Sequence, residues 1–391
     1  MTSNQGVPAD EAVMPFPIFV SDADLADLAE RLARTRWPDA GTVMDGSQGP
    51  TLAAVRLLVK RWQDGYDWRA AETLLNGWGS SRTVLDGVGV HFLHIRSPEP
   101  DALPLLLAHG WPGSVLEFRG MIGPLTDPAA HGGDPRQAFH LVIPSMPGFG
   151  YSDRPSTPGW NVGRVARAWA ELMQRLGYGE CWFAQGGDWG AAVVTTLAHM
   201  RAPGLVGIHL NMVLFQPTQD EIADATPEEQ DMLAGMKRYW EEQSGYMSLQ
   251  NTRPQSVGFA LTDSPVGLAA WIYALFQEMT DSGGQPERVI PLDHIIDDVM
   301  LYWLPGAAAS SARFYWENKH AAGGAPSDPV PLPAGVTMFP CEAVRLSRRW
   351  AKRRFTDLRH YDQPDRGGHF AAMENPDALM AAIRATFSSL R

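Results

Sequence analysis

The sequence is poor in cysteine: Cys181 and Cys341 are the only two among 391 residues. Both lie in strand-like apolar runs, which predicts buried free thiols in a reducing compartment. The sequence also lacks any uncharged apolar run long enough to cross a bilayer, so we expect no transmembrane helix. Residues 1–15 are polar and acidic and lack the basic and apolar regions of a secretion signal. These absences predict a cytoplasmic protein without a membrane anchor.

Positive charge is also scarce, because 32 Lys and Arg residues face 44 Asp and Glu residues, which leaves a net charge of −12. An acidic protein repels phosphate backbones, so we expect no nucleic-acid partner. The sequence lacks a His-Glu-x-x-His motif and a cysteine cluster, and His91 and His94 lie three apart in a predicted strand, on opposite faces. We therefore expect neither a metal nor a cofactor.

The length allows two to three domains, or one large α/β domain with an insertion. Apolar spacing and capping residues predict helices at 20–36, 51–63 and 67–76, and no strands over 1–80. From residue 83 short apolar runs alternate with helices, which predicts a parallel sheet covered on both faces. The predicted strands are a hairpin at 83–95 and runs at 104–108, 138–143, 181–185, 205–212, 335–339 and 357–361. The predicted helices of this part are 162–176 and 376–390.

Residues 213–330 interrupt the alternation, because they are mostly helical and rich in Tyr, Trp and Met. A helical insertion after a strand is typical of a lid over the C-terminal edge of the sheet, where open α/β folds bind ligands. The predicted fold class is therefore α/β, with a helical N-terminal segment and a helical lid. The predicted parts are 1–82 for the N-terminal segment, 83–212 for the first part of the core, 213–330 for the lid and 331–391 for the second part of the core.

The strand at 181–185 leads directly into Gly186-Gly187-Asp188-Trp189-Gly190 and then into a helix. This strand–turn–helix setting is typical of the Gly-x-Ser-x-Gly nucleophile elbow, here with Asp in place of Ser. On its own the pattern also fits an acidic helix cap. As a nucleophile, a carboxylate can displace at a saturated carbon and form an ester on the enzyme, which water must then hydrolyse. Asp188 thus predicts alkyl transfer rather than ester or peptide cleavage.

The predicted strand at 104–108 ends in the sequence HGWPG, where this type of fold supplies its second oxyanion donor. The backbone N–H groups of Trp111 and Trp189 are therefore expected to converge on the carbonyl oxygen of the ester and form an oxyanion hole. A plain β-turn with a buried histidine is the alternative for this segment.

Among eleven histidines, His369 is the best candidate for the base, because it follows the last predicted strand and precedes the last helix. Glu342, at the end of the strand before, is expected to accept a hydrogen bond from His369 Nδ1 and hold its tautomer. Three other carboxylates are closer to His369 in sequence and are rivals for this role: Asp357, Asp362 and Asp365.

Together with these features, motifs from residue 15 to residue 385 make the chain resemble the microsomal-type epoxide hydrolases, which include the insect juvenile hormone epoxide hydrolases. The motifs are PFPIFVSDADLADLAERLARTRWPD, YDWRAAETLLN, HGWPGS, PSMPGFGYSDRP, QGGDWG, SGYMSLQ, LTDSPVGLAAWI, SSARFYWEN, FPCE and GGHFAAMENP. The resemblance implies an α/β-hydrolase fold and hydrolysis of an epoxide to a vicinal diol. Membrane-bound relatives begin with a hydrophobic anchor and this chain does not, which predicts a soluble form.

The resemblance also implies roles for individual residues: Asp188 as nucleophile, His369 as base and Glu342 as acid. It further implies that Tyr246 and Tyr315, both in the lid, bind the epoxide oxygen. A phenol is suited to this task because it can donate a proton to a basic alkoxide, although without the resemblance both tyrosines would more often be packing residues.

Three other functions remain open at this point. A haloalkane-type dehalogenase would use the same aspartate, a ligand-binding protein on the same fold would have lost turnover, and a cyclising enzyme would replace water with a substrate hydroxyl. The aromatic lid predicts a hydrophobic epoxide as substrate, with water as the second reactant. Detoxification and secondary metabolism are both compatible with the sequence, and so is a homo-oligomer.

Overall fold

The computed structural model describes residues 12–321 and 329–390. The expectation about a secretion signal therefore concerns a segment that lies mostly outside the described residues. The predicted lid at 213–330 likewise includes a stretch, 322–328, that lies outside them.

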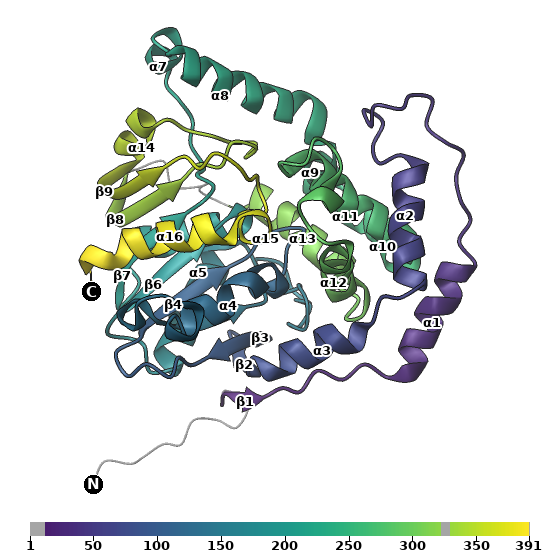
Figure 1. Ribbon diagram of the computed structural model, residues 1–391, viewed down its shortest axis with the longest axis horizontal. Coiled ribbons are helices and arrows are strands. Elements are labelled where there is room, and N and C mark those ends of the chain that lie inside the picture. The colour runs from purple at the N-terminus through teal and green to yellow at the C-terminus, as the bar shows by residue number, and fades with distance from the viewer. Residues whose placement is uncertain (1–11, 322–328, 391) are drawn as a thin grey trace.

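A mixed sheet of nine strands runs through the described part of the chain, in the order β1-β2-β3-β5-β4-β6-β7-β8-β9 (Figure 1). The strands are β1 (Met14–Pro15), β2 (Ser80–Leu85), β3 (Val88–Ile95), β4 (Leu103–Ala108), β5 (Phe139–Pro144), β6 (Trp182–Gly186), β7 (Leu205–Leu210), β8 (Val330–Thr337) and β9 (Phe355–Asp362). The strands from β5 to β9 in this order pair in parallel. At the other end, β1, β2 and β3 pair antiparallel, and β3 pairs antiparallel with β5.

The parallel sheet predicted from the alternation is confirmed for the strands from β5 to β9, and the predicted hairpin is confirmed as β2 and β3. A tight turn reverses the chain between β2 and β3, so both strands cannot run with the parallel set. The prediction that 1–80 lacks strands is wrong, because Met14 pairs with Arg82 and Pro15 with Ser81. A strand of two residues is too short to show an alternation of apolar and polar residues in the sequence. Its hydrogen-bonding partner is β2, at the edge of the sheet.

Strand β8 begins earlier than the predicted run at 335–339, at Val330. Pro331 and Pro333 look like strand breakers in the sequence. The pairing register between β8 and β9 shifts between Val330 and Pro333, and proline is tolerated at such irregular positions.

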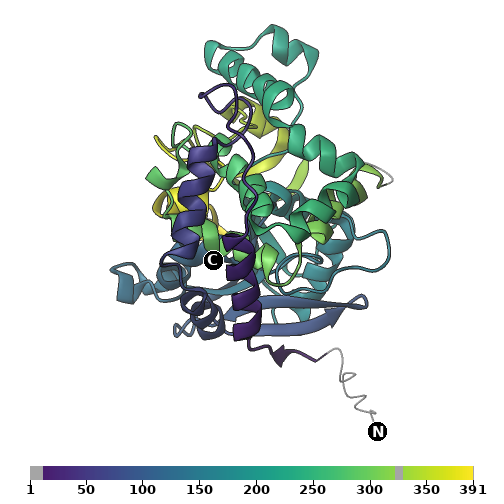
Figure 2. The same cartoon turned by 90° about the vertical axis from the view of Figure 1, so that its right-hand side faces the viewer.

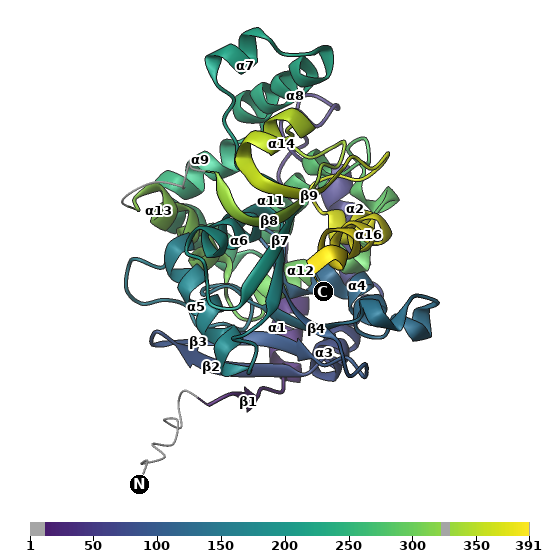
Figure 3. The same cartoon turned by 90° about the vertical axis from the view of Figure 1, so that its left-hand side faces the viewer.

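Helices cover both faces of the sheet, with α5 and α6 on one face and α4 and α16 on the other (Figure 3). The helices of the core are α4 (Arg119–Thr126), α5 (Val162–Arg175), α6 (Asp188–His199), α14 (Arg348–Arg354), α15 (Ala371–Glu374) and α16 (Pro376–Phe387). Helix α5 shows why these helices pack as they do. Its apolar residues recur at helical spacing and half of its residues are buried, so one face lies on the sheet.

Between β7 and β8 the described residues are mostly helical. They form α7 (Gln219–Ala223), α8 (Pro227–Arg238), α9 (Gly245–Thr252), α10 (Pro254–Asp263), α11 (Pro265–Met279), α12 (Leu292–Trp303) and α13 (Ala308–Lys319). A π-helical segment, Tyr239–Gln243, joins α8 to the region of α9. Taken one at a time, none of the described helices has the length and apolar content to span a membrane; α10 and α11 meet those criteria only as a pair, and the pair is bent by 119°.

The N-terminal helices pack against the lid rather than against the parallel part of the sheet (Figures 1 and 2). They are α1 (Asp22–Ala33), α2 (Leu52–Gln63) and α3 (Trp68–Gly77), and both α1 and α2 contact α11. An ion pair between Arg61 and Asp293, with nitrogen and oxygen 2.6 Å apart, joins α2 to α12. The N-terminal segment thus clamps the lid from the outside.

The two cysteine thiols are free, but neither is buried as expected: Cys181 is half-buried and Cys341 is exposed. Cys181 immediately precedes β6, and Cys341 lies beyond the end of β8. Both therefore sit just outside the strand whose apolar run suggested burial.

Candidate active site

Asp188 stands at a sharp turn between β6 and α6. Its backbone adopts the left-handed conformation, with φ of 48°, which is strained for a residue with a side chain. The turn depends on glycine. A Cβ atom on Gly190 would lie 1.9 Å from the carbonyl oxygen of Ala108, and one on Gly186 would lie 2.5 Å from the backbone of Gly190. The glycines let β4, β6 and α6 approach closely enough to hold Asp188 above the sheet edge.

The loop after β4 binds the Asp188 carboxylate. The backbone N–H of Trp111 donates a hydrogen bond to Asp188 Oδ1, with the two atoms 2.8 Å apart. Gly110 makes room for this contact, because a Cβ there would lie 2.2 Å from the same oxygen. Trp189 is the second residue of α6, where backbone N–H groups have no partner within the helix. Of the two predicted oxyanion residues, Trp111 thus contacts the Asp188 carboxylate directly, and Trp189 directly follows Asp188 in the chain.

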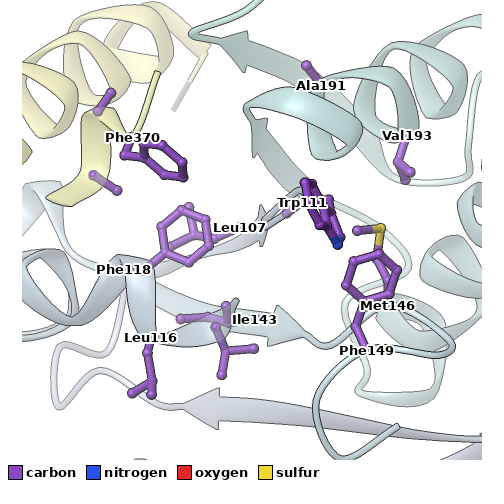
Figure 4. Close-up of a cluster of buried hydrophobic side chains, with 14 of the residues drawn as sticks. Leu107, Trp111, Leu116, Phe118, Ile143, Met146, Phe149, Ala191, Val193 and Phe370 are labelled. Atoms are coloured by element: carbon purple, nitrogen blue, oxygen red, sulfur yellow. The ribbon is translucent and has the colours of Figure 1, made fainter. Parts of the chain in front are cut away.

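The Trp111 side chain helps to fix this loop. It is 3% exposed and belongs to a cluster of buried side chains that includes Met146, Phe149 and Phe118 (Figure 4). Burial of a large aromatic ring anchors the backbone on both sides of it.

His369 lies between the two carboxylates named from the sequence. Its Nε2 is 3.4 Å from Asp188 Oδ2, and its Nδ1 is 2.9 Å from Glu342 Oε2. Glu342 is 3% exposed. Of the rivals, Asp357 pairs with Arg359 and Asp362 accepts a hydrogen bond from Thr337. No contact between His369 and a rival carboxylate occurs within the described residues.

The charges around His369 control its protonation. Burial alone would lower the pKa of His369, but the charge of Glu342 and the hydrogen bond with Asp188 outweigh burial and raise this pKa well above its usual value. The raised pKa favours the protonated imidazolium of His369 as long as Asp188 has not reacted. Loss of the Asp188 charge would lower this pKa and favour the neutral imidazole, which is the form that can accept a proton.

The two tyrosines named from the sequence lie above Asp188. Tyr246 comes from α9 and Tyr315 from α13, and their ring centroids are 6.0 Å apart. Tyr246 stacks on Trp111 at 5.2 Å between centroids, and Tyr315 meets Trp189 edge-on at 4.9 Å. Burial raises the pKa of both phenols well above the usual range, and the nearby Asp188 charge raises it further, so both keep their protons.

A cavity of about 110 Å³ lies between these groups. It is lined by Asp188, His369, Glu342, Tyr246, Tyr315 and Trp189, together with Met and Leu side chains and a third tyrosine. The structure thus brings the residues predicted from the sequence to one place, although they come from separate stretches of the chain.

Sequence analysis missed two groups at this site. The third tyrosine is Tyr239, whose hydroxyl lies 3.0 Å from that of Tyr246. Its spacing from Tyr246, about two helical turns, could have suggested a shared face. Glu117 lines a second, smaller cavity together with Asp188, and no motif in the sequence pointed to it. Among the described residues, no group of three or more His, Cys, Asp or Glu side chains could hold a metal ion.

Comparison with known proteins gives the family. The model for the epoxide hydrolase N terminus matches residues 13–118, and that for the alpha/beta hydrolase fold matches residues 104–262. A protein from Stigmatella aurantiaca is 52% identical over 97% of this chain and 86% of its own length. Epoxide hydrolase 1 from Sus scrofa is 34% identical over 96% of this chain and 88% of its own length.

The chain belongs to the epoxide hydrolase family. It is a hydrolase that acts on epoxides, on the α/β-hydrolase fold expected from the sequence. Solved structures of other epoxide hydrolases agree over nearly the whole chain. The juvenile hormone epoxide hydrolase of Bombyx mori superimposes with a TM-score of 0.90 at 29% identity, covering 98% of this chain and 95% of that one. The Aspergillus niger epoxide hydrolase gives 0.86 at 27% identity, covering 98% of both.

Proposed function

We propose that this epoxide hydrolase works in two steps through a covalent ester on Asp188. The observation that carries the proposal is the position of the Asp188 carboxylate. Its Oδ1 accepts the Trp111 N–H, its Oδ2 lies 3.4 Å from His369, and two neutral phenols share the cavity with it. A nucleophile, an oxyanion donor, a base and proton donors thus surround one small volume.

In the first step, Asp188 Oδ2 attacks an epoxide carbon and the carbon–oxygen bond of the ring breaks. The electron pair of that bond goes to the epoxide oxygen. Tyr246 and Tyr315 stabilise the oxygen by hydrogen bonds, and one of them donates the proton that it needs. Two phenols spread the developing charge better than one, and the Tyr239 hydroxyl can in turn bond to Tyr246. The product of this step is a hydroxyalkyl ester.

In the second step, water attacks the Asp188 carboxyl carbon and His369 Nε2 takes a proton from it. The backbone N–H groups of Trp111 and Trp189 stabilise the negative charge on Oδ1. The tetrahedral intermediate collapses, the ester oxygen leaves with the product, and His369 returns the proton to it. The negative charge of Glu342 lowers the free energy of the imidazolium form of His369. The second hydrogen of the water stays at first on the regenerated Asp188 carboxyl group and is then passed on to restore the tyrosine that gave up its proton in the first step. The product is a vicinal diol, and the water oxygen stays in Asp188.

The substrate is proposed to be a hydrophobic epoxide, since aromatic rings and Met and Leu side chains line much of the cavity. Water is the second reactant, and neither nucleic acid nor a membrane anchor has a part in the proposal. The cytoplasm is the proposed location, which fits two free thiols in a chain of this length.

A single turnover in oxygen-18 water, with enzyme in excess over a styrene-type epoxide, tests the proposal. We expect the first diol to be mostly unlabelled and the label to appear in the peptide that contains Asp188. Direct hydration of the epoxide would instead give a fully labelled diol and an unlabelled peptide, and the proposal would then be wrong.

Two variants provide an independent check. Replacing His369 with Gln should trap the ester, so that intact-protein mass rises by the mass of the substrate. Replacing Asp188 with Ala should abolish both the adduct and turnover. Full turnover by the alanine variant would contradict the assignment of the nucleophile.

A further inference from the structure

A second, much smaller cavity also touches the catalytic groups. Its volume is about 20 Å³, and its polar lining residues are Asp188, His369, Glu117, Gln185 and Asn211. Apart from Asp188 and His369, none of the residues around the tyrosine-lined cavity takes part in it. Both cavities therefore reach the Asp188 carboxylate, but the other residues that line them are different, except for His369.

The size of the small cavity suits a single water molecule. One water needs about 10–15 Å³ of this kind of volume and two to four polar partners. A volume of about 20 Å³ is too small for an organic substrate. The polar walls supply enough hydrogen-bonding groups to hold one water in a fixed place.

Glu117 is the unassigned acid at this place. It lies in a short 3-10 helix, Val115–Phe118, and its neighbours Leu116 and Phe118 are buried, whereas Glu117 keeps some accessible surface. Its carboxyl group lies over the oxyanion loop, since a Cβ on Gly113 would be 2.2 Å from Glu117 Oε2. Within the described residues no protein donor reaches this carboxyl group. A polar group at this depth is expected to bind a partner.

A second polar side chain that lines the cavity has a hydrogen-bond acceptor without a protein donor. Gln185 is 1% exposed, and its Nε2 donates to Asn211 Oδ1 across 2.7 Å. This bond fixes the orientation of the amide, and the remaining oxygen, Gln185 Oε1, is buried without a protein partner among the residues that the structure describes. A buried acceptor of this kind costs free energy unless water or another donor reaches it. The Glu117 carboxyl group and Gln185 Oε1 thus both lack a protein donor among the described residues, and one small polar ligand in the cavity can reach both.

We infer that this cavity holds the water that hydrolyses the ester, and that Glu117 binds and orients this water. The inference rests on the proposed two-step mechanism. One hydrogen of the water points to His369 Nε2 and the other to the Glu117 carboxyl group. The water oxygen then forms its bond to the Asp188 carboxyl carbon as His369 takes the first hydrogen. Glu117 neither gains nor loses a proton in the net reaction, so its role is to position the water.

The charges around Glu117 fit this role. Burial, with the negative charges of Asp298 and Asp188, raises the pKa of Glu117 well above its usual value. A neutral carboxyl group can both donate to water and accept from it, whereas a carboxylate only accepts. The raised pKa favours this neutral form, which would also avoid a second negative charge beside Asp188 before the epoxide is opened.

The test separates the two steps in the full chain, with styrene oxide as the probe. Stopped-flow tryptophan fluorescence follows ester formation, and quenched-flow mass spectrometry follows ester loss. We expect Glu117→Met, which keeps the length of the side chain, to slow ester hydrolysis by roughly 10²-fold, the cost of a misplaced reactant. Ester formation should stay within about threefold of the parent enzyme. Glu117→Gln, which can still bind water, should restore most of the hydrolysis rate.

Glu171→Met is the matched control, because Glu171 is a half-buried glutamate on α5 that does not line the cavity. Ester formation and ester hydrolysis in this variant should both stay within about threefold of the parent enzyme. Should Glu117→Met not fold, Gly113→Ala tests the same point, since its new Cβ displaces the Glu117 carboxyl group.

The inference is overturned if the ester forms in Glu117→Met and is hydrolysed at the parent rate. It is also overturned if Glu171→Met slows hydrolysis as much as Glu117→Met does. If no ester forms in any variant, including His369→Gln, the two-step mechanism itself is wrong and the inference fails with it. Loss of hydrolysis alone, restored by Gln, supports Glu117 as the residue that positions the water.

Discussion

Glu229 anchors the lid to the core, and its replacement by Gln should show this as a pH-dependent loss of stability. The carboxylate lies on α8 and is 2% exposed. It accepts a hydrogen bond from Ser347 Oγ across 2.5 Å and one from Arg349 Nη2 across 2.7 Å. Ser347 and Arg349 begin α14 of the core. The contacts therefore connect a lid helix to the segment that follows Glu342.

The magnitude follows from the pKa of Glu229. Hydrogen bonding from Arg349 lowers this pKa from 4.5 to about 2, against the opposing effect of burial. At about 1.36 kcal/mol per pH unit, this difference corresponds to roughly 3 kcal/mol. Because Arg349 is 45% exposed, solvent screens the pair and we expect a loss of only about 1–2 kcal/mol.

The sign of the pH dependence is set by the lowered pKa. A carboxylate with a lowered pKa in the folded state stabilises the protein above its unfolded pKa, here 4.5, and this stabilisation is lost as pH falls toward about 2. The difference between parent and variant should therefore be constant from pH 6 to 8 and shrink below about pH 4.5.

Urea unfolding at a series of pH values measures the difference. Glu228→Gln is the control, because Glu228 is the neighbouring exposed acid on the same helix, and a surface change of this kind should stay within about 0.5 kcal/mol. A Glu229→Gln difference that stays the same down to pH 3.5, or one no larger than that of the control, would refute the reasoning.

Three further predictions concern the site itself. The charge of Glu342 helps to raise the pKa of His369. Replacing Glu342 with Gln should therefore move the acid limb of the pH profile for ester hydrolysis to lower pH and reduce the maximum rate of this step. A single-turnover pH profile that moves to higher pH would contradict this. Gly190→Ala should cost at least about 3 kcal/mol in urea unfolding, because its Cβ would lie 1.9 Å from a backbone oxygen of β4, and a normal midpoint would disprove the close packing. Tyr246→Phe or Tyr315→Phe should each slow ester formation by roughly 10- to 10²-fold and the double variant by far more, and near-normal ester formation in the double variant would rule out their proposed role.

Local chemistry made much of the fold predictable from the sequence. The elbow from 182 to 199 is a strand, a glycine turn and a helix, and the steric demands of such a turn are met by residues within a few positions of Asp188. The hairpin around Asp86-Gly87 is local in the same way, and the structure has β2 and β3 on either side of it. Order along the chain also placed the nucleophile, the acid and the histidine in the right succession.

What depends on distant partners could not be predicted in this way. The edge strand at Met14 and Pro15 exists because Ser81 and Arg82, which lie far along the chain, offer free backbone groups. The exposure of Cys341 depends on where β8 ends and not on the residues around the thiol.

The sequence by itself determined which side chains could do chemistry, because Asp in place of Ser at an elbow already selects attack at saturated carbon. Only the tertiary structure decided which of them meet. Folding brings the Trp111 N–H within 2.8 Å of Asp188 from a distant loop, and it brings lid tyrosines from two separate helices into one cavity. Glu117 has no motif of its own, so its place beside Asp188 emerges only when the oxyanion loop and the elbow pack together. The physical reason is that residue type is local, whereas distance, burial and charge arise from contacts between distant segments.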